Sequence, residues 1–151
     1  MLHLADTNVA GACTYTNASW QQIYGISLAE SLGDGWSSAL HPDDRESVFV
    51  EWQRTAAERI EFDKEFRIRH ASGDIRHVHA RAQALIESGE VVVGYVGSVQ
   101  DVTQRVRAEQ ALKRNASDLR RSLTQPVRER GNGMFRPARR ASTPIGRISL
   151  V

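Results

Sequence analysis

Two histidines and two adjacent carboxylates are the residues whose types and spacing come closest to those of a chemical site. His77 and His79 are two residues apart, a spacing that places two side chains on one face of a strand and suits two ligands of a metal ion. In the expected register of their strand they face Arg69 and Arg67 on the outer side of a sheet. Because nearby cations oppose a bound cation, the sequence predicts no metal site.

The carboxylate pair is Asp43 and Asp44, close to His41. The pair follows Pro42 at the start of an expected helix, where acidic side chains complement the positive end of the helix dipole. His41 is expected to satisfy local backbone N–H groups. No nucleophile or oxyanion-stabilising group accompanies these residues. The two glycine-rich phosphate-binding motifs, Gly-x-x-x-x-Gly-Lys and Gly-x-Gly-x-x-Gly, do not occur in the chain. A small hydrolase is the enzymatic alternative, but no catalytic residue is predicted.

The composition excludes several other classes of protein. Cys13 is the only cysteine of the 151 residues, so an internal disulfide is excluded, and we expect it to be a small buried side chain. Residues 126–151 hold six of the 20 Lys and Arg and one of the 18 Asp and Glu, a charge of +5 that leaves −3 for residues 1–125. We therefore expect no nucleic-acid partner. Without a membrane-length apolar run or a signal peptide, a cytoplasmic location is expected.

The elements that must position these residues can be placed from local signals. Two short strands are predicted at Leu2–Ala5 and Ala12–Thr16. A helix is expected to begin after Asn17 and to stop at Gly25, and a second short helix lies in "SLAESLGDG". A longer helix begins at Pro42, with Val48, Trp52 and Ala56 on its buried face.

Three further strands form a meander. Apolar residues occupy the even positions of residues 60–70 and 75–86, and the two sets share a face if Ser72-Gly73-Asp74 is a three-residue loop. This register pairs Glu65 with Arg81. A two-residue turn at Ser88-Gly89 then pairs Ile86 with Val91 and Ala82 with Tyr95. It predicts one inner face that includes Val91, Val93, Tyr95, Gly97 and Val99, and an outer face that carries Leu85, Val92 and Val96.

Small residues at the centre of the inner face predict unfilled space above the sheet. The central strand carries Ala80, Ala82 and Ala84, and its neighbour contributes Gly97. Either the helices fill this space with aromatic side chains, which is the favoured interpretation, or a ligand does. The candidate ligand pocket consists of Trp20, Tyr24, Trp36, Trp52, Phe66, Ala80, Ala82, Tyr95 and Gly97.

The last predicted helix begins near Thr103, which we expect to be its N-cap, and ends before Pro126. From Leu112 onward Ala116, Leu119 and Leu123 follow a heptad-like spacing. Residues 126–151 are rich in Arg, Pro, Gly and Ser without periodicity, so disorder is predicted there. The expected organisation is a core of residues 1–102, a linker helix of residues 103–125 and a tail of residues 126–151.

In this order of elements the chain resembles the PAS domain of bacterial sensor kinases and cyclic-di-GMP enzymes. The resemblance is carried by "GACTYTNASWQQIYG", "HPDD", "FRIRHASGDIRHVHARAQAL" and "VVGYVGSVQDVTQRVRAEQAL". It implies an α+β fold, with a five-stranded antiparallel sheet, short helices on one face and a C-terminal linker helix. By this resemblance Gln100, Asp101 and Thr103 would couple the sheet to the helix.

The resemblance also implies a function and partners. It indicates a non-catalytic sensory or dimerisation module of a signalling protein, most simply a histidine kinase, with a kinase or cyclase domain downstream. A homodimer through the linker helix and the outer sheet face is expected. A pocket that holds haem or flavin is the alternative. The cysteine motif of the light-sensing flavin subclass does not occur in this chain, so a photochemical adduct is not expected.

Overall fold

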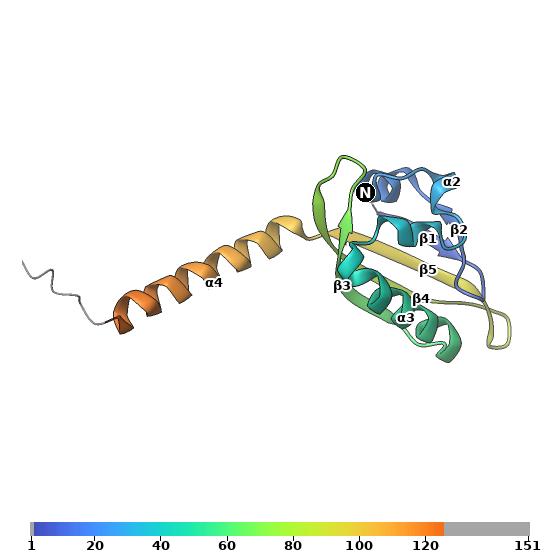
Figure 1. Cartoon of the computed structure of the whole chain (residues 1–151). Helices are drawn as coiled ribbons and strands as arrows, with labels where there is room; N and C mark the ends of the chain where they lie inside the picture. Colours follow the sequence, from blue (N-terminus) through green and yellow to red (C-terminus); the bar gives the residue numbers. More distant parts are fainter. Residues whose placement is uncertain (1, 126–151) are drawn as a thin grey trace, which may run out of the picture. The chain divides into compact units, whose positions relative to one another are not determined.

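A computed structural model describes residues 2–125 of the chain. Its elements, labelled in Figure 1, are β1 (Leu4–Thr7), β2 (Cys13–Thr16), α1 (Ala18–Tyr24), α2 (Leu28–Ser31), η1 (Gly35–Ala39, a 3₁₀-helix), α3 (Pro42–Glu58), β3 (Phe62–Arg69), β4 (Ile75–Glu87), β5 (Val91–Asp101) and α4 (Thr103–Thr124). The five strands form one antiparallel sheet in the order β2-β1-β5-β4-β3. The predicted fold class is confirmed.

The predicted ends of α1 and the start of α3 are confirmed by their caps. Asn17 accepts a hydrogen bond from the backbone N–H of Trp20, and Gly25 takes the left-handed conformation at φ 72° that ends the helix. At α3, Pro42 occupies the first turn and His41 Nδ1 accepts from the backbone N–H of Asp43 at 3.1 Å. His41 thus has the local role that the sequence predicts.

The short helix expected in "SLAESLGDG" is confirmed as α2, which ends before Gly33, and a 3₁₀-helix that was not predicted follows it. Ser27 and Glu30 form a reciprocal capping box around the single turn of α2. The turn ends at Leu32, and a separate 3₁₀-helix, η1, follows from Gly35. A Cβ on Gly35 would lie 2.0 Å from the carbonyl oxygen of Glu30, so the close approach of these two elements requires glycine.

The faces of β3 and β4 agree with the prediction, but the predicted register is wrong by two residues. The loop is His70–Asp74, and Arg69 pairs with Ile75, Arg67 with His77 and Glu65 with His79. The loop is longer because His70 accepts the backbone N–H of Ser72 on Nδ1 and the N–H of Gly73 on its carbonyl. A shift of two residues leaves the same side chains on each face.

The predicted register of β4 and β5 is also wrong by two residues. Near the turn of this hairpin, the side chains of β5 lie on the faces opposite to those predicted. Ala82 pairs with Gly97 and Ala84 with Tyr95, and a bulge follows Leu85. The bulge inverts the alternation that precedes it. Val91 and Val93 are therefore exposed, whereas Val92, predicted on the outer face, packs against the core.

The core lies between the inner face of the sheet and the helices α1, η1 and α3 (Figure 1). Phe66, Tyr95 and Ala82 all belong to this core or pack against it, so the predicted shared face is confirmed. Cys13 is buried as predicted. Within residues 2–125, no helix has the length and hydropathy to cross a membrane.

The chain divides into two compact units at Lys113. The sheet, α1 to α3 and the first turns of α4 belong to the first unit. In the second unit, α4 continues from Arg114 to Thr124 with Leu119 and Leu123 exposed. The predicted disorder of residues 126–151 lies outside the described residues.

Candidate ligand cavity and helix junction

A cavity of about 80 Å³ lies on the inner face of the sheet beneath α1 and α3. Most of the predicted pocket residues line it: Trp20, Tyr24, Trp36, Trp52, Phe66, Ala80, Ala82 and Gly97. Tyr95 does not line it, because its ring packs edge-on against Trp52 and its hydroxyl donates to the carbonyl of Ala56 at 3.0 Å.

Aromatic rings fill most of the space above the small residues. The ring of Trp52 meets those of Trp36 and Phe62 edge-on, at centroid distances of 6.5 Å and 5.6 Å. Trp20 and Tyr24 stack with centroids 3.9 Å apart and planes 9° from parallel. The helices therefore fill most of the gap, as the favoured interpretation held, and a small cavity remains.

Several residues that line the cavity were not predicted. Phe62 and Val99 lie on the predicted inner face and could have been found from the alternation of their strands. Ala5 and Thr7 line the cavity because β1 pairs with β5, a long-range pairing that no local pattern reveals. Cys13 lines it from β2, and burial raises the pKa of its thiol.

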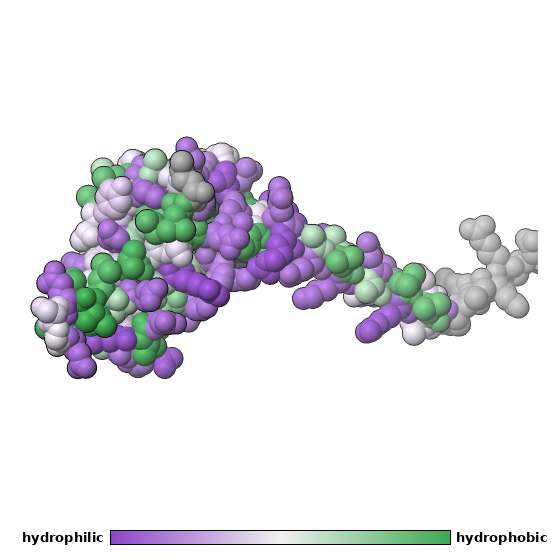
Figure 2. Space-filling model, turned by 180° about the vertical axis from the view of Figure 1, so that it is seen from behind, coloured by the Kyte–Doolittle hydropathy of each residue, from purple (hydrophilic) through white to green (hydrophobic). Residues whose placement is uncertain are grey.

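The outer face of the sheet carries a groove of about 710 Å³ behind the same patch of strands. Leu2, Leu4 and Val96 contribute apolar side chains to this groove, which also borders Ala82 and Gly97. The view from behind in Figure 2 shows hydrophobic patches among hydrophilic side chains. Cavity and groove therefore lie on opposite faces of the same Ala82–Gly97 pair.

Of the two histidines of β4, His79 contacts Asp63 of β3 on the outer face, together with the neighbouring Arg81. His79 Nε2 lies 2.5 Å from Asp63 Oδ1, and Arg81 Nε lies 3.2 Å from Asp63 Oδ2. The bond to His79, followed by the charge of Arg81, lowers the pKa of Asp63. Among residues 2–125 no three His, Cys, Asp or Glu side chains are grouped to hold a metal ion.

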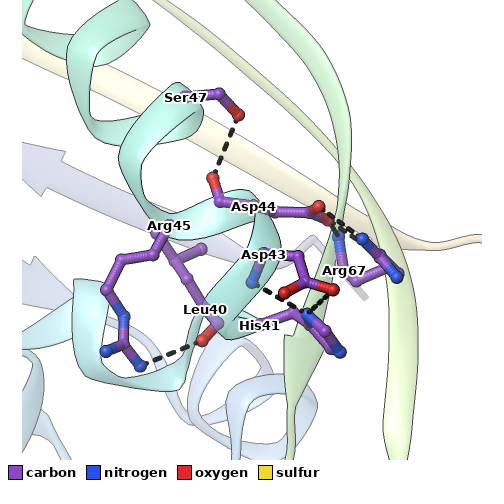
Figure 3. Close-up of polar contacts among 7 residues, drawn as sticks. All are labelled: Leu40, His41, Asp43, Asp44, Arg45, Ser47 and Arg67. Atoms are coloured by element: carbon purple, nitrogen blue, oxygen red, sulfur yellow. Dashed lines mark hydrogen bonds and ion pairs between the residues drawn. The ribbon is translucent and has the colours of Figure 1, made fainter.

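Asp44 has a role that the sequence did not indicate (Figure 3). Its carboxylate accepts from the backbone N–H of Arg67 at 2.9 Å, from Arg67 Nε at 3.0 Å and from Arg67 Nη2 at 2.7 Å. These bonds lower the pKa of Asp44 and raise the pKa of Arg67. The neighbouring backbone N–H of His41 donates to the carbonyl of Arg67 at 3.0 Å. Together the bonds fasten the start of α3 to the edge strand β3.

The junction between β5 and α4 is held by Asp101, Thr103 and His77. Asp101 Oδ1 accepts from the backbone N–H of Thr103 at 2.9 Å and from its hydroxyl at 2.5 Å. On β4, the N–H of His77 donates to Thr103 Oγ1 at 3.0 Å, and its carbonyl accepts from the N–H of Val102 at 2.9 Å. Thr103 is the first helical residue rather than the N-cap, so that prediction is wrong, and Asp101 supplies the acceptor instead.

Further contacts tie the first turns of α4 to the sheet. Arg105 forms ion pairs with Glu65 of β3 and with Glu109 one turn later. Arg107 Nη2 donates to the carbonyl of Ile75 at 3.3 Å. Gln100, the third predicted coupling residue, is exposed near the end of β5, where its backbone pairs with His79.

The same end of β4 also holds α1. Arg76 Nη1 donates to the carbonyls of Gln22 and Ile23 at 3.1 Å and 3.0 Å, and His70 Nε2 lies 3.2 Å from the carbonyl of Gln22. These are carbonyls of the last turn of α1, which lack partners within the helix. The helix that carries Trp20 and Tyr24 into the cavity is thus bound to the strand that also contacts α4.

Comparison with known proteins agrees with this architecture. Residues 14–99 match the family model of the PAS fold. The solved structure of a sensory box histidine kinase/response regulator from Burkholderia thailandensis is 36% identical, with a TM-score of 0.61, and the match covers 80% of this chain and 91% of that one.

Two curated proteins are also similar. An uncharacterised protein of Sinorhizobium fredii is 32% identical over 101 residues, which are 67% of this chain and 12% of that protein. The methyl sulfide methyltransferase-associated sensor of Methanosarcina acetivorans is 37% identical over 81 residues, 51% of this chain and 8% of that protein. The matched region is thus a small part of each curated relative. The chain belongs to the PAS fold family, whose model matches more than half of its length.

Proposed function

We propose that this PAS domain is the sensory module of a larger signalling protein, and that it passes the occupancy of its cavity through the end of β5 to α4. The observation that carries the proposal is the junction, where Asp101 of β5 and His77 of β4 both bond to Thr103 of α4. The first helical residue is therefore bound to two adjacent strands at once.

The cavity lies close to this junction along the chain. Val99 lines the cavity, and Asp101 follows it two residues later on the same strand. Because this part of β5 is extended and paired with β4, we expect a displacement at Val99 to be carried along β5 rather than absorbed by a loop. A shift of the end of β5 moves the acceptor for Thr103 and with it the first turn of α4.

We propose that a histidine kinase is the downstream partner and that the chain also forms a homodimer with a second copy of itself. The 36% identical relative carries the name of a histidine kinase, and the Methanosarcina relative that of a sensor. Leu112, Leu119 and Leu123 are exposed on α4 at a heptad-like spacing. These leucines are one candidate surface for a homodimer, and the mixed polar and apolar groove of the outer sheet face is a second, separate one.

Replacing Asp101 with alanine is expected to loosen the start of α4. The substitution removes both bonds to Thr103, so amide hydrogen exchange of residues 102–112 should accelerate by about tenfold. Asp34→Ala is the control, because Asp34 is exposed and makes no capping bond at η1. Unchanged exchange over residues 102–112 in Asp101→Ala would show that the junction does not couple sheet and helix.

The small volume of the cavity argues against the alternative of a haem or flavin sensor. The cavity volume of about 80 Å³ is roughly half that of an engineered cavity that accepts a benzene ring. Haem and flavin are several times larger than benzene. The aromatic rings of Trp20, Trp36 and Trp52 occupy the space that either group would need.

We therefore expect purified protein mixed with haem or with flavin mononucleotide to bind neither one. After gel filtration the protein fraction should carry no absorbance band in the visible region. Tyr95→Phe is a control for altered packing, because it removes a hydroxyl outside the cavity lining. A stoichiometric visible band with either cofactor would contradict this expectation.

A further inference from the structure

The first three residues of β4 bond to two different helices. On the side of α4, the carbonyl of Ile75 accepts from Arg107 Nη2 at 3.3 Å. The N–H of His77 donates to Thr103 Oγ1 at 3.0 Å, and its carbonyl accepts from the N–H of Val102 at 2.9 Å. The start of α4 is therefore bonded to backbone atoms of β4, which are displaced only when the strand itself is displaced.

Arg76, the residue between these two, bonds to α1. Its Nη1 donates to the carbonyls of Gln22 and Ile23 at 3.1 Å and 3.0 Å. A charged donor forms stronger hydrogen bonds than a neutral one, so Arg76 fixes the last turn of α1 to the strand. His70 Nε2 also lies 3.2 Å from the carbonyl of Gln22, but His70 belongs to the loop between β3 and β4. Arg76 is therefore the residue of β4 itself that joins α1 to the strand.

The helix that Arg76 holds forms part of the cavity wall. Trp20 and Tyr24 of α1 line the cavity, and their rings stack with centroids 3.9 Å apart. Ile23, whose carbonyl bonds to Arg76, lies between them in the sequence and is buried. With only seven residues and a cap at each end, α1 is expected to move as one body. A displacement of either ring should therefore shift the carbonyls that Arg76 holds.

We infer that Arg76 is a positioning residue in a second route from the cavity to α4, separate from the route along β5. A shift of α1 displaces Arg76 and the start of β4, and the bonds of Ile75 and His77 pass this displacement to α4. The two routes meet at Thr103, which bonds to Asp101 of β5 and to His77 of β4. The inference rests on the proposed sensory function, because both routes carry the state of the same cavity.

A double-mutant cycle tests this route, with amide hydrogen exchange of residues 103–112 as the readout. Trp20→Phe replaces a ring of α1 in the cavity wall with a smaller one and should accelerate this exchange by about threefold, near the low end of the coupling measured between interacting residues. In an Arg76→Gln background the same substitution should change the exchange by less than about 1.5-fold, because the route is already interrupted. If Arg76 only stabilised the fold, the effects of the two substitutions would be independent.

Arg69→Gln is the matched control, because Arg69 is exposed and its backbone pairs with Ile75 at the same end of the sheet. In this background Trp20→Phe should keep its full effect. Arg76→Lys retains a cation that can donate to both carbonyls, so it should restore most of the effect. Exchange of residues 62–69 in β3, measured in the same samples, reports any general loss of stability. If Arg76→Gln accelerates it, Arg76→Met, which keeps an unbranched side chain without a charged donor, takes its place in the cycle.

Two results would overturn the inference. Either Trp20→Phe leaves the exchange of residues 103–112 unchanged in the wild-type background, or it accelerates this exchange equally with and without Arg76. The proposed function fails separately. If Asp101→Ala leaves the exchange unchanged while the cycle shows the expected coupling, the route through β4 stands and the route along β5 falls. If Asp101→Ala accelerates the exchange while the cycle shows no coupling, the reverse holds.

Discussion

Replacing Asp44 with alanine is expected to lower the free energy of unfolding by about 2 kcal/mol. The carboxylate accepts three hydrogen bonds from Arg67, one of them from the backbone N–H of the edge strand β3. The variant leaves this N–H and the guanidinium without their acceptor. We expect no larger decrease in the free energy of unfolding, because the Arg67 side chain is 36% exposed and water can replace part of the lost hydrogen bonding. Urea denaturation followed by tryptophan fluorescence measures the difference.

Asp43→Ala is the matched control, because Asp43 lies on the same turn, its side chain is 75% exposed, and its carboxylate lies 3.8 Å from His41 Nδ1. It should change the free energy of unfolding by less than about 0.5 kcal/mol. The effect of Asp44→Ala should also depend on pH. The folded-state pKa of Asp44 lies below the ordinary value of 3.8, so its contribution is complete above that pH and is lost as the pH falls through the folded-state pKa. Equal losses for both variants at neutral pH would contradict the assignment.

Replacing Gly94 with alanine is expected to lower the free energy of unfolding by about 3 kcal/mol. A Cβ at this position would lie 2.2 Å from the carbonyl oxygen of Thr7, which is backbone at the end of β1 and cannot rotate away. The pairing of β1 with β5 must open locally to admit the methyl group. Since Ala5 and Thr7 of β1 line the cavity, the variant should also lose any ligand response there.

Gly97→Ala on the same strand is the comparison. Its nearest backbone atom would be the carbonyl oxygen of Arg81 at 3.3 Å, so a shift of a few tenths of an ångström accommodates the methyl group. We expect a loss of about 1 kcal/mol in the same urea experiment. If Gly94→Ala were no more destabilising than Gly97→Ala, the close packing of Thr7 against β5 would not exist in solution.

The faces of the meander could be predicted because alternation in a strand has a period of two. Phe66, Ala82 and Tyr95 lie on one side in any register shifted by an even number of residues. For the same reason the alternation could not distinguish the Glu65–Arg81 pair from the observed Glu65–His79 pair. The hydrogen bonds of the His70 side chain decide the loop length, and hydrophobic periodicity carries no information about them.

The prediction was wrong where the backbone departs from regular alternation. The bulge after Leu85 exchanges the environments of Val91 and Val92, and nothing in the run of valines marks its place. The 3₁₀-helix η1 was missed because "GWSSA" carries no periodic apolar pattern. Local sequence patterns could not predict the strand order either, because β1 lies beside β5, which is more than 80 residues away in the chain.

For the candidate site, residue types were more informative than positions. Small residues at the centre of the sheet indicated where space could remain, although filling by aromatic side chains was the favoured interpretation, and the Asp101-Val102-Thr103 segment marked the strand-to-helix junction. Asp44 was interpreted as a helix-dipole complement because its partner, Arg67, is 23 residues away.

The Ala82–Gly97 pair separates the inner cavity from the outer groove by the thickness of a single polypeptide layer. This partition has no bulky side chain to stiffen it at its centre. A ligand in the cavity and a protein bound at the groove would both contact this pair of residues. Each would then change the binding affinity of the other by the same factor, because the coupling free energy between two sites is reciprocal. A small molecule that tightened contact with a neighbouring protein severalfold would itself be retained more tightly by the same factor, so assembly would tune the detection threshold.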